Sequence, residues 1–415
     1  MRDLIVIGGG AAGLWASGTA ADRGLDVLVL EKNRKAGVKI LMSGGTRCNI
    51  THACEITGIV EAYGKKQGRF LKPSLYQLDP ATVVNTFNEL GVPTKVESTG
   101  KVFPVSDRAL DVRDALVRRL TEAGAQLQAG VAVKEVAFSQ SESCWKVSIE
   151  GECLETRQVL LCCGGLSYSG CGTTGDGYAW ARQAGHSLVE TRPALTPLLS
   201  PAAWVHQLSG ITLPDVGVRI GLKQGKIKDP RNFSRGGFLW THFGCSGPAP
   251  MNVSRFVSDL SRPQDAHVQL DLLPEVNEEA VEVAFDGSKS GSRSVLSLLN
   301  EWLPRKLSQA LLMKNSTSED RPLAELPRKA RLGLIESLKR LQVPLAGTRG
   351  YPKAEVTAGG VSTSEVDPKT MESRLAPGLF LAGEILDLDG PIGGYNFQAA
   401  FSTGHNAALH TSKGA

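Results

Sequence analysis

The sequence predicts an α/β protein in which a dinucleotide-binding sheet is built from both ends of the chain. Three observations lead to this prediction. A glycine-rich strand–helix–strand pattern fills about the first thirty residues, prolines and short strands replace that pattern at about residue 191, and the pattern returns after residue 350. We therefore expect the middle of the chain to be an insertion into one sheet.

Length and composition exclude some classes of protein. At about 150 residues per domain, the 415 residues suggest two or three domains. Lysine and arginine number 46 and aspartate and glutamate 42, so the net charge of +4 is too small to make the whole surface a binder of nucleic acid or membrane. No apolar run approaches the roughly 18 residues of a membrane-spanning helix, so we expect no membrane partner.

The eight cysteines predict a reducing compartment. They include no Cys-x-x-Cys pair, and the histidines show no metal-ligand spacing, so we expect free thiols, no metal site and a cytoplasmic protein. The chain begins Met1-Arg2-Asp3 and runs directly into a strand-like segment, which predicts that no secretory leader is present.

The opening pattern reads as one strand–helix–strand unit. Residues 4–7 predict a strand, residues 11–23 a helix that Gly24 ends, and residues 27–30 a second strand. The turn between the first strand and the helix has the spacing G-x-G-x-x-G. In that spacing the first glycine permits the turn, the second lets backbone approach a pyrophosphate, and the third lets the helix pack on the strand. The cofactor-binding residues predicted here are Gly8, Gly10, Ala11, Ala12 and Gly13.

An acidic residue completes this pattern. Glu31 ends the second strand 18 residues after Gly13, about where a carboxylate accepts hydrogen bonds from an adenosine ribose. A plain structural turn is the alternative, since glycines recur in many turns. The order and spacing of the two strands, the helix and the acidic residue favour a dinucleotide site.

A glycine-rich polar connection follows over residues 32–51, where no periodicity predicts a regular element. It ends in a loop that carries Ser43, Gly44, Arg47, Cys48 and Asn49. A loop of this kind beside a nucleotide site is suited to bonding phosphate or flavin oxygens, whereas the ordinary alternative is a solvated surface loop.

The rest of the first 190 residues continues in α/β style. Asp79 and Pro80 predict a helix N-cap and first turn. We expect helices over 80–91 and 109–123, and strands over 131–136, 145–149 and 159–163, the last followed by Gly164 and Gly165.

A second glycine pattern, Gly170-x-Gly172-x-x-Gly175, precedes a helix-like segment over 178–184. The preceding strand is expected to end at about Cys163, so several residues separate it from the first glycine. The tight strand-to-helix turn of a dinucleotide site is absent, and we predict no second NAD site here.

From residue 191 the sequence changes character. Prolines and an alternating strand over 216–222 predict a β-rich domain, and residues 276–340 have helical spacing. The predicted division is residues 1–190 plus 350–415 for the dinucleotide domain, 191–275 plus about 341–349 for the β-rich domain, and 276–340 for the helical domain.

The helical segment is locally basic. Residues 305–340 contain nine lysines and arginines against four aspartates and glutamates. A solvated helix face is the ordinary interpretation, and a patch that meets a nucleic-acid backbone is the functional one.

The last part of the chain returns to α/β character. A strand over 379–382 leads into Gly383-Glu384, and the turn Gly393-Gly394-Tyr395-Asn396 precedes a helix over 397–409. We expect this segment to complete the sheet that begins at residue 1.

Taken together, the opening turn with Glu31, the strand ending in Gly164-Gly165 and the strand before Gly383-Glu384 resemble FAD enzymes of the glutathione-reductase type. The chain is more closely similar to the BaiN/RdsA family of flavoproteins. The motifs that carry this second resemblance lie in family order over Lys39–Thr51, Gly172–Tyr178, Thr241–Pro248, Thr357–Val361 and Gly383–Asn396. It implies an FAD-binding Rossmann domain with an inserted β-barrel-like domain and a small helical one, tightly bound FAD, and NAD(P)H at most as an external reductant.

Two positions depart from the family pattern. Thr46 stands where the family usually has a third glycine, and His52 where it tends to have asparagine. Threonine is an awkward occupant if that backbone requires a positive φ.

The resemblance also implies roles for side chains. Val133 would offer backbone groups to the adenine, Glu384 would bond the ribityl chain, and the turn before the last helix would aim N–H groups at the flavin. The further cofactor residues it implies are Lys32, Lys39, Ser43, Gly44, Arg47, Cys48, Asn49, Gly164, Gly165, Asp176, Gly383, Gly393, Gly394, Tyr395 and Asn396.

The candidates for acid–base work are Cys48, Asp176, His242, Asp387 and Tyr395. Each has a structural alternative. Cys48 could simply pack, Asp176 could cap a helix, and His242 could be a satisfied core histidine. A loop-stabilising hydrogen bond would explain the other two.

Two functions follow from the resemblance, and a third from another class stays open beside them. One is reduction of a uridine in large-subunit ribosomal RNA to dihydrouridine, and another is oxidation of a small amine such as aminoacetone by O₂. The third is a flavin-bound protein without turnover. The basic segment over 305–340 favours RNA as the partner.

Overall fold

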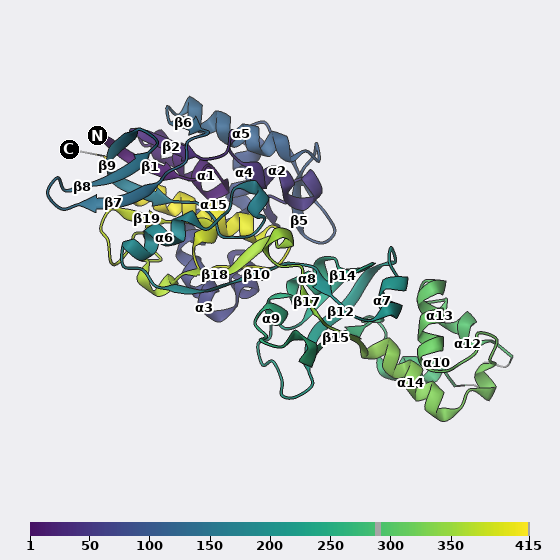
Figure 1. Cartoon of the computed structure of the whole chain (residues 1–415). Coiled ribbons are helices and arrows are strands. Elements are labelled where there is room, and N and C mark those ends of the chain that lie inside the picture. The colour runs from purple at the N-terminus through teal and green to yellow at the C-terminus, as the bar shows by residue number, and fades with distance from the viewer. Residues whose placement is uncertain (287–291, 414–415) are drawn as a thin grey trace. The chain divides into compact units, whose positions relative to one another are not determined.

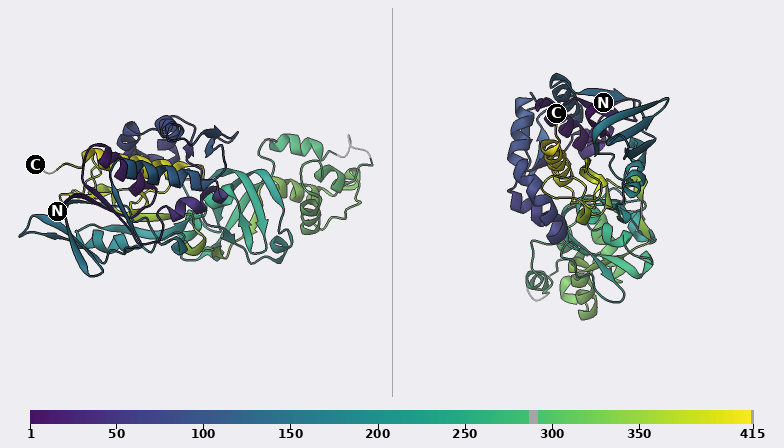
Figure 2. Two further views of the ribbon diagram at one scale, coloured as in Figure 1. Left: turned by 90° about the horizontal axis from the view of Figure 1, so that it is seen from above. Right: turned by 90° about the vertical axis from the view of Figure 1, so that its left-hand side faces the viewer.

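The computed structural model describes residues 1–286 and 292–413, and the chain divides into two compact units (Figure 1). Unit 1 comprises Met1–Pro193 and Ala354–Ala415, and unit 2 comprises Ala194–Lys353. The first strand and the last helix, drawn in purple and yellow, belong to the same unit (Figure 2).

Unit 1 is organised around a seven-stranded sheet. Five strands are parallel in the order β6-β2-β1-β9-β19, and β8 and β7 extend the sheet antiparallel from β9. Their bounds are β1 Arg2–Ile7, β2 Val27–Glu31, β6 Gln126–Ala129, β7 Glu135–Ser139, β8 Cys144–Ile149, β9 Glu152–Leu161 and β19 Leu379–Leu381. Because β19 pairs with β9, the expectation that the carboxyl-terminal segment completes the first sheet is confirmed.

The central strands are apolar because helices cover both faces. Every residue of β2 is buried, and Leu4, Ile5 and Val6 of β1 have no exposed surface. The helices of unit 1 are α1 Ala11–Asp22, α2 Val38–Met42, α3 Ile56–Gln77, α4 Pro80–Glu89, α5 Ala109–Glu122, α6 Asp176–Gln183 and α15 Tyr395–His410.

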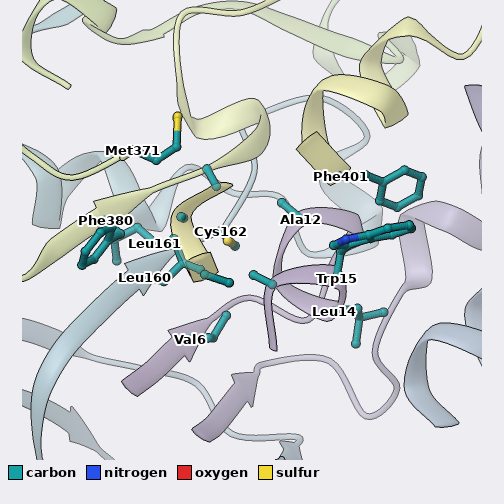
Figure 3. Packing of buried hydrophobic residues seen from close by; sticks show 14 of the residues in the cluster. Val6, Ala12, Leu14, Trp15, Leu160, Leu161, Cys162, Met371, Phe380 and Phe401 are labelled. Atoms are coloured by element: carbon teal, nitrogen blue, oxygen red, sulfur yellow. The ribbon is translucent and has the colours of Figure 1, made fainter. Parts of the chain in front are cut away.

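Helices α1 and α15 join the two ends of the chain in one core. A Cβ on Gly404 of α15 would lie 2.4 Å from the carbonyl oxygen of Ala12, so only glycine permits this close approach. The rings of Trp15 and Phe401 pack at a centroid distance of 4.9 Å (Figure 3). The first and last helices are thus held together by side chains with almost no exposed surface.

Two small sheets lie in the same unit. Their strands are β10 Leu188–Ala194 with β18 Val356–Val361, and β3 Thr51–His52 with β5 Lys101–Pro104 and β4 Thr94–Val96. The predicted N-cap is confirmed, since the Asp79 carboxylate accepts the backbone N–H of Thr82 at 2.7 Å.

The secondary-structure expectations were wrong at two places in unit 1. Residues 131–134 form no strand, although their exposure alternates. Instead the Val131 and Lys134 N–H groups donate to the carbonyls of Glu31 and Ser148 as the chain crosses to β7. The connection 32–51 does contain a helix, α2, whose five residues are too few to show a helical period.

Unit 2 contains a seven-stranded antiparallel sheet in the order β16-β15-β12-β13-β14-β11-β17. The bounds are β11 Leu198–Leu199, β12 Thr212–Leu222, β13 Ser234–Thr241, β14 Gly244–Ser246, β15 Ala266–Asp271, β16 Leu341–Pro344 and β17 Gly347–Thr348. Strand β12, expected over 216–222, therefore begins four residues earlier.

The helical segment follows β15 in unit 2. Its helices are α10 Glu278–Ala284, α12 Val295–Leu299, α13 Arg305–Lys314 and α14 Arg328–Lys339, and the shorter helices nearer the sheet are α7 Ala203–Gln207, α8 Pro248–Asn252 and α9 Arg255–Ser258. Leu334 and Leu338 of α14 belong to the same buried cluster as Leu270 and Val343 of the sheet. Helices and sheet therefore share one hydrophobic core.

Candidate functional site

Four of the predicted cofactor-binding segments gather at one edge of the unit 1 sheet. Strands β1, β2, β9 and β19 are parallel, so their carboxyl ends lie at the same edge. The segments that follow these ends are the glycine turn 8–13, Glu31, the pair 164–165 and the pair 383–384. Four separate parts of the sequence thus meet where ligands bind in open α/β sheets.

The three glycines of the opening turn differ in what surrounds them. A Cβ on Gly8, whose φ is +106°, would lie 2.5 Å from the carbonyl oxygen of Cys162. A Cβ on Gly13 would lie 2.0 Å from the carbonyl oxygen of Gly8. A Cβ on Gly10 would meet no atom within 4 Å. The first and third glycines therefore permit close packing within the protein, and the second borders open space.

Glu31 is held by the protein backbone. Its side chain is buried, and its two carboxylate oxygens accept the N–H groups of Gly9 and Asn33, each at 2.8 Å. These bonds orient the carboxylate at the end of β2, where the ribose of a dinucleotide would meet it.

A second charged cluster surrounds Glu384. Lys39 Nζ donates to a Glu384 carboxylate oxygen at 2.5 Å and to Ser167 Oγ at 2.7 Å. The Thr357 N–H donates to the other carboxylate oxygen at 3.0 Å, and Ser167 Oγ donates to it as well. Ser167 and Thr357 were not among the predicted site residues. The Thr357 hydroxyl also accepts the N–H groups of Leu166 and Ser167, which fixes the turn after β9.

The loop after α2 is strained. Gly44, Gly45, Thr46 and Cys48 have φ values of 54°, 67°, 71° and 61°, in the left-handed region that favours glycine. Thr46, the departure from the family pattern, thus occupies a position that a glycine would fill without strain.

We expect Thr46→Gly to raise the free energy of unfolding of unit 1 by about 0.5–1 kcal/mol. A left-handed L-residue costs about 1–2 kcal/mol, and the greater freedom of glycine in the unfolded chain offsets part of that gain. Denaturant unfolding measures the change, with Thr46→Ala as the control that keeps a Cβ. A destabilised Thr46→Gly protein would contradict this account of the strain.

The same loop presents Arg47 and Asn49. The Arg47 guanidinium pairs with Glu97 at 2.8 Å and lies 4.0 Å from the centroid of the Phe103 ring, so it is engaged within the protein. The hydrogen bond to Glu97 is the main cause that raises the pKa of Arg47. The Asn49 side-chain oxygen is buried and has no hydrogen-bond partner within the described residues. A donor group on a bound ligand would satisfy this acceptor.

Asp176 begins α6 but is not its N-cap, which is Gly175. The Asp176 carboxylate accepts Lys32 Nζ at 2.5 Å and Thr174 Oγ1 at 2.8 Å. Strand β9 ends at Leu161, well before Gly170, so the second glycine pattern lacks the strand-to-helix turn, as predicted.

The turn before α15 approaches β3 closely. Gly393 and Gly394 have φ values of 140° and 91°, and a Cβ on Gly394 would lie 2.3 Å from the carbonyl of Thr51. The Asn396 side chain holds the turn by accepting the Gly390 N–H and donating to the Gly390 carbonyl, both at 2.9 Å. The His52 ring stacks on Tyr395 at 4.7 Å.

Two residues of α3 support this turn and were missed by sequence reasoning. Tyr63 Oη donates to the carbonyl of Tyr395 at 3.1 Å. Gln67 Nε2 donates to the Asp387 carbonyl at 3.1 Å and to an Asp389 carboxylate oxygen at 3.0 Å. No short motif marks these side chains, because they act through a helix whose position only the fold determines.

The acid–base candidates differ in accessibility. Cys48 has no exposed surface, and burial raises the pKa of its thiol to about 12, so it is a neutral packing residue. Burial likewise raises the pKa of Tyr395 to about 12. Asp387 is buried beside Gln67. His242 is exposed in the turn between β13 and β14 of unit 2, so its interpretation as a core histidine was wrong.

The remaining expectations concern an adenine contact, a metal site and a membrane span. For the adenine contact, Val133 is partly buried in the connection 131–134. Glu142, Cys144 and Glu155 place ligand-type atoms within 4.8 Å of one another, but Lys146 pairs with Glu142 at 2.5 Å in the same cluster. Among the residues that the structure describes, no helix is both long and apolar enough to cross a membrane.

Comparison with known proteins identifies a matching family and similar full-length proteins. A family model described as the HI0933-like protein Rossmann domain matches residues 2–410. The ribosomal RNA dihydrouridine synthase of Escherichia coli (strain K12) is 32% identical over 404 residues, which cover 97% of this chain and 96% of that protein. The 3-dehydro-bile acid delta(4,6)-reductase of Clostridium scindens is 32% identical over 413 residues, which cover 98% of each chain.

Among solved structures, the 3-ketosteroid delta1-dehydrogenase of Sterolibacterium denitrificans aligns with a TM-score of 0.55 at 15% identity and covers 99% of both chains. At this identity the alignment shows a shared fold.

Proposed function

Because the chain belongs to the HI0933-like Rossmann-domain family of FAD-dependent oxidoreductases, whose BaiN/RdsA members its motifs resemble, we propose that it reduces a carbon–carbon double bond conjugated to a carbonyl. We further propose that the physiological substrate is a uridine of large-subunit ribosomal RNA. Two full-length relatives are named for dihydrouridine synthesis in ribosomal RNA, and a third is named as a reductase of a 3-oxo steroid diene. Uridine and such a diene share a double bond conjugated to a carbonyl, which accepts hydride.

The observation that carries the proposal is the assembly of flavin-site segments at one sheet edge. The residues fit FAD, because Gly10 borders open space for a pyrophosphate and Asn49 presents a buried oxygen without a donor. Glu31 would bond the ribose. When bound, the flavin supplies a hydride through N5 of its isoalloxazine ring.

The chain's own residues would hold and tune that cofactor. The Lys39–Glu384–Ser167 cluster would bond the ribityl chain, since it offers both a cation and hydroxyl-bonding oxygens. The N-terminus of α15 begins at Tyr395 and carries the positive end of the helix dipole. That end would favour negative charge on a reduced flavin.

The basic segment supports RNA as the partner only in part. Three of its nine cations are paired: Arg305 with Glu319, Lys339 with Asp271, and Arg340 with Glu278 and Glu336. Lys314 lies over the Trp204 ring. The cations without a recorded ion pair among the described residues are Lys306, Arg321, Arg328, Lys329 and Arg331.

Three of these unpaired cations occupy the first four residues of α14. Positive charge there opposes the helix dipole and costs stability, which contact with an anion would offset. The segment Arg328–Arg331 is therefore the part of the basic patch that we propose meets RNA phosphates.

Replacing Arg328, Lys329 and Arg331 with glutamine is expected to weaken RNA binding and to reduce the salt slope of log K by about 2–3, because up to three phosphate contacts are lost. FAD content should not change. Filter binding at several salt concentrations measures the slope. The control is Lys223→Gln/Lys226→Gln/Lys228→Gln, which makes the same charge change elsewhere in unit 2. Equal salt slopes for both triple variants would remove this patch from the interface.

Mass spectrometry of ribosomal RNA from cells with and without the gene tests the substrate directly. We expect a two-hydrogen mass increment at a uridine that disappears in the deletion and returns with the gene. Unchanged dihydrouridine content would reject the RNA substrate. Anaerobic mixing of the holoenzyme with aminoacetone separates the amine-oxidase alternative, since that activity would bleach the flavin band.

A further inference from the structure

The motif over Thr241–Pro248 lies at the hairpin between β13 and β14 of unit 2, and packing explains only some of its residues. A Cβ on Gly244, whose φ is +151°, would lie 2.2 Å from the carbonyl oxygen of Leu198, so the close approach requires glycine. Cys245 is buried in the core of the unit. His242, in contrast, is exposed, and its ring makes no hydrogen bond or ion pair within the described residues. Packing therefore gives no reason for a histidine at this position.

The ring of Phe243 contacts His242 and also an arginine from a later part of the chain. The His242 ring meets it edge-to-face, at a centroid distance of 5.0 Å. The Arg349 guanidinium lies over the same ring, 4.5 Å from its centroid. Phe243 is only partly buried, and the other two side chains are exposed. We call these three residues the hairpin platform.

One short strand holds the two parts of the hairpin platform together. Strand β11 pairs with β14 on one side and with β17, which directly precedes Arg349, on the other. Two further backbone bonds extend this pairing to the platform itself. The Ser200 N–H donates to the Phe243 carbonyl, and the Arg349 N–H donates to the Pro197 carbonyl, both at 3.0 Å. The backbone thus fixes the hairpin platform without hydrogen bonds from its side chains.

The charge of Arg349 is left without a carboxylate. Its guanidinium makes no hydrogen bond or ion pair with any residue that the structure describes. Other arginines of unit 2 are paired, as Arg235 is with Asp215 and Arg340 with Glu278. A guanidinium that stacks on a ring keeps its other flat face and its N–H donors for a ligand. A planar group beside a negative charge would match both.

We propose that the hairpin platform binds an unpaired nucleotide of RNA, a proposal that rests on the proposed function. Unpaired bases stack on aromatic rings and on arginine planes, and His242 and Arg349 offer both at an exposed surface. The N–H groups of the same guanidinium would donate to the neighbouring phosphate. A base inside a duplex is not available for such stacking, so the platform would favour single-stranded RNA. The segment Arg328–Arg331, argued from charge alone, supplies no such preference.

The experiment measures binding of the FAD-loaded full chain to a short single-stranded oligouridylate and to a blunt RNA duplex of equal length. Arg349→Lys keeps the positive charge but removes the planar group, Arg349→Ala removes both, and Phe243→Leu removes the ring beneath the guanidinium. The controls are Arg219→Lys and Phe233→Leu. They alter a similar exposed pair of unit 2, in which Arg219 lies 5.4 Å from the centroid of the Phe233 ring. Fluorescence anisotropy at several salt concentrations gives the affinities.

Arg349→Lys is expected to weaken binding of the single strand by about 5–20-fold, because one base loses its stacking partner. Its salt slope and its affinity for the duplex should not change, since the charge is kept. Arg349→Ala should weaken the single strand at least as much and should also reduce the salt slope of log K by about 0.7, for one lost phosphate contact. Phe243→Leu should resemble Arg349→Lys, and both controls should bind as wild type.

Two results would overturn the hairpin platform. One is an Arg349→Lys protein that binds the single strand as tightly as wild type, and the other is an equal loss of affinity for the duplex, which has no unpaired base. Dihydrouridine in ribosomal RNA of deletion cells that express the wild-type chain separates this failure from failure of the proposed function. If wild type restores dihydrouridine but does not bind the oligouridylate, or the variants bind it equally, the platform alone is rejected. A wild type that restores none would overturn the proposed function and the RNA role of the platform with it.

Discussion

Replacing Gly10 with alanine is expected to leave unit 1 folded but unable to retain FAD. Gly10 has φ −85° and ψ −167°, an extended conformation that alanine adopts, and an added Cβ would meet no protein atom within 4 Å. The methyl group would instead fill the space into which the pyrophosphate must fit. We expect the affinity for FAD to fall by about 100-fold, or about 2.7 kcal/mol. Absorbance of the purified protein and titration of the apoprotein with FAD measure the loss.

Two other glycines make this test specific. Gly170 also has open space around its Cβ position but belongs to the glycine pattern without a strand-to-helix turn, so Gly170→Ala should retain FAD. Gly13→Ala should fail for a different reason, since its Cβ would lie 2.0 Å from the carbonyl of Gly8 and the apoprotein itself would be destabilised. A yellow, fully loaded Gly10→Ala protein would show that the cofactor is not bound at this turn.

The second large effect is expected from Phe401→Ala in the core between α1 and α15. The Phe401 ring is fully buried and packs against Trp15 at 4.9 Å and against Phe87 and Phe397 at 5.8 Å. Removing such a ring leaves a cavity and costs about 3–5 kcal/mol of unfolding free energy. Denaturant unfolding measures this cost. The transition of unit 1 is the one that moves to a higher denaturant concentration when FAD is added, because a ligand stabilises the unit that binds it.

Phe401→Leu is the matched variant for this cavity. It keeps an apolar side chain in the same position and should cost about 1–1.5 kcal/mol. A loss below about 1 kcal/mol for Phe401→Ala would mean that the two ends of the chain hold together without this aromatic cluster.

The fold of unit 1 was predictable where local pattern and packing agree. The sequence signals here come from residues that the local backbone requires. They mark the opening turn, Glu31 and the strand ending near Cys163, and the structure places all three at one sheet edge. The helix expected over 397–409 was found as Tyr395–His410. The glycine that usually stands at the position of Thr46 indicates a positive φ, and the φ of Thr46 is 71°.

Other features had no local signal. The alternation over 131–136 predicted a strand, but no neighbouring strand pairs with residues 131–134, and pairing is a tertiary property. Tyr63 and Gln67 act on turns far away in sequence, so only the folded chain reveals them. Thr357 lies in a family motif, but its hydrogen bond to the turn after β9 is visible only in the fold. A core position was one alternative for His242, whereas the structure exposes this side chain in a turn.

The pairing of β19 with β9 and the packing of α15 on α1 have a consequence for biosynthesis. A ribosome makes β19 and α15 long after β9 and α1, so the nascent chain carries an unpaired β9 edge and an uncovered α1 until these later elements emerge. Cofactor capture must then await their synthesis, and a product cut short before residue 379 would be colourless and prone to aggregation.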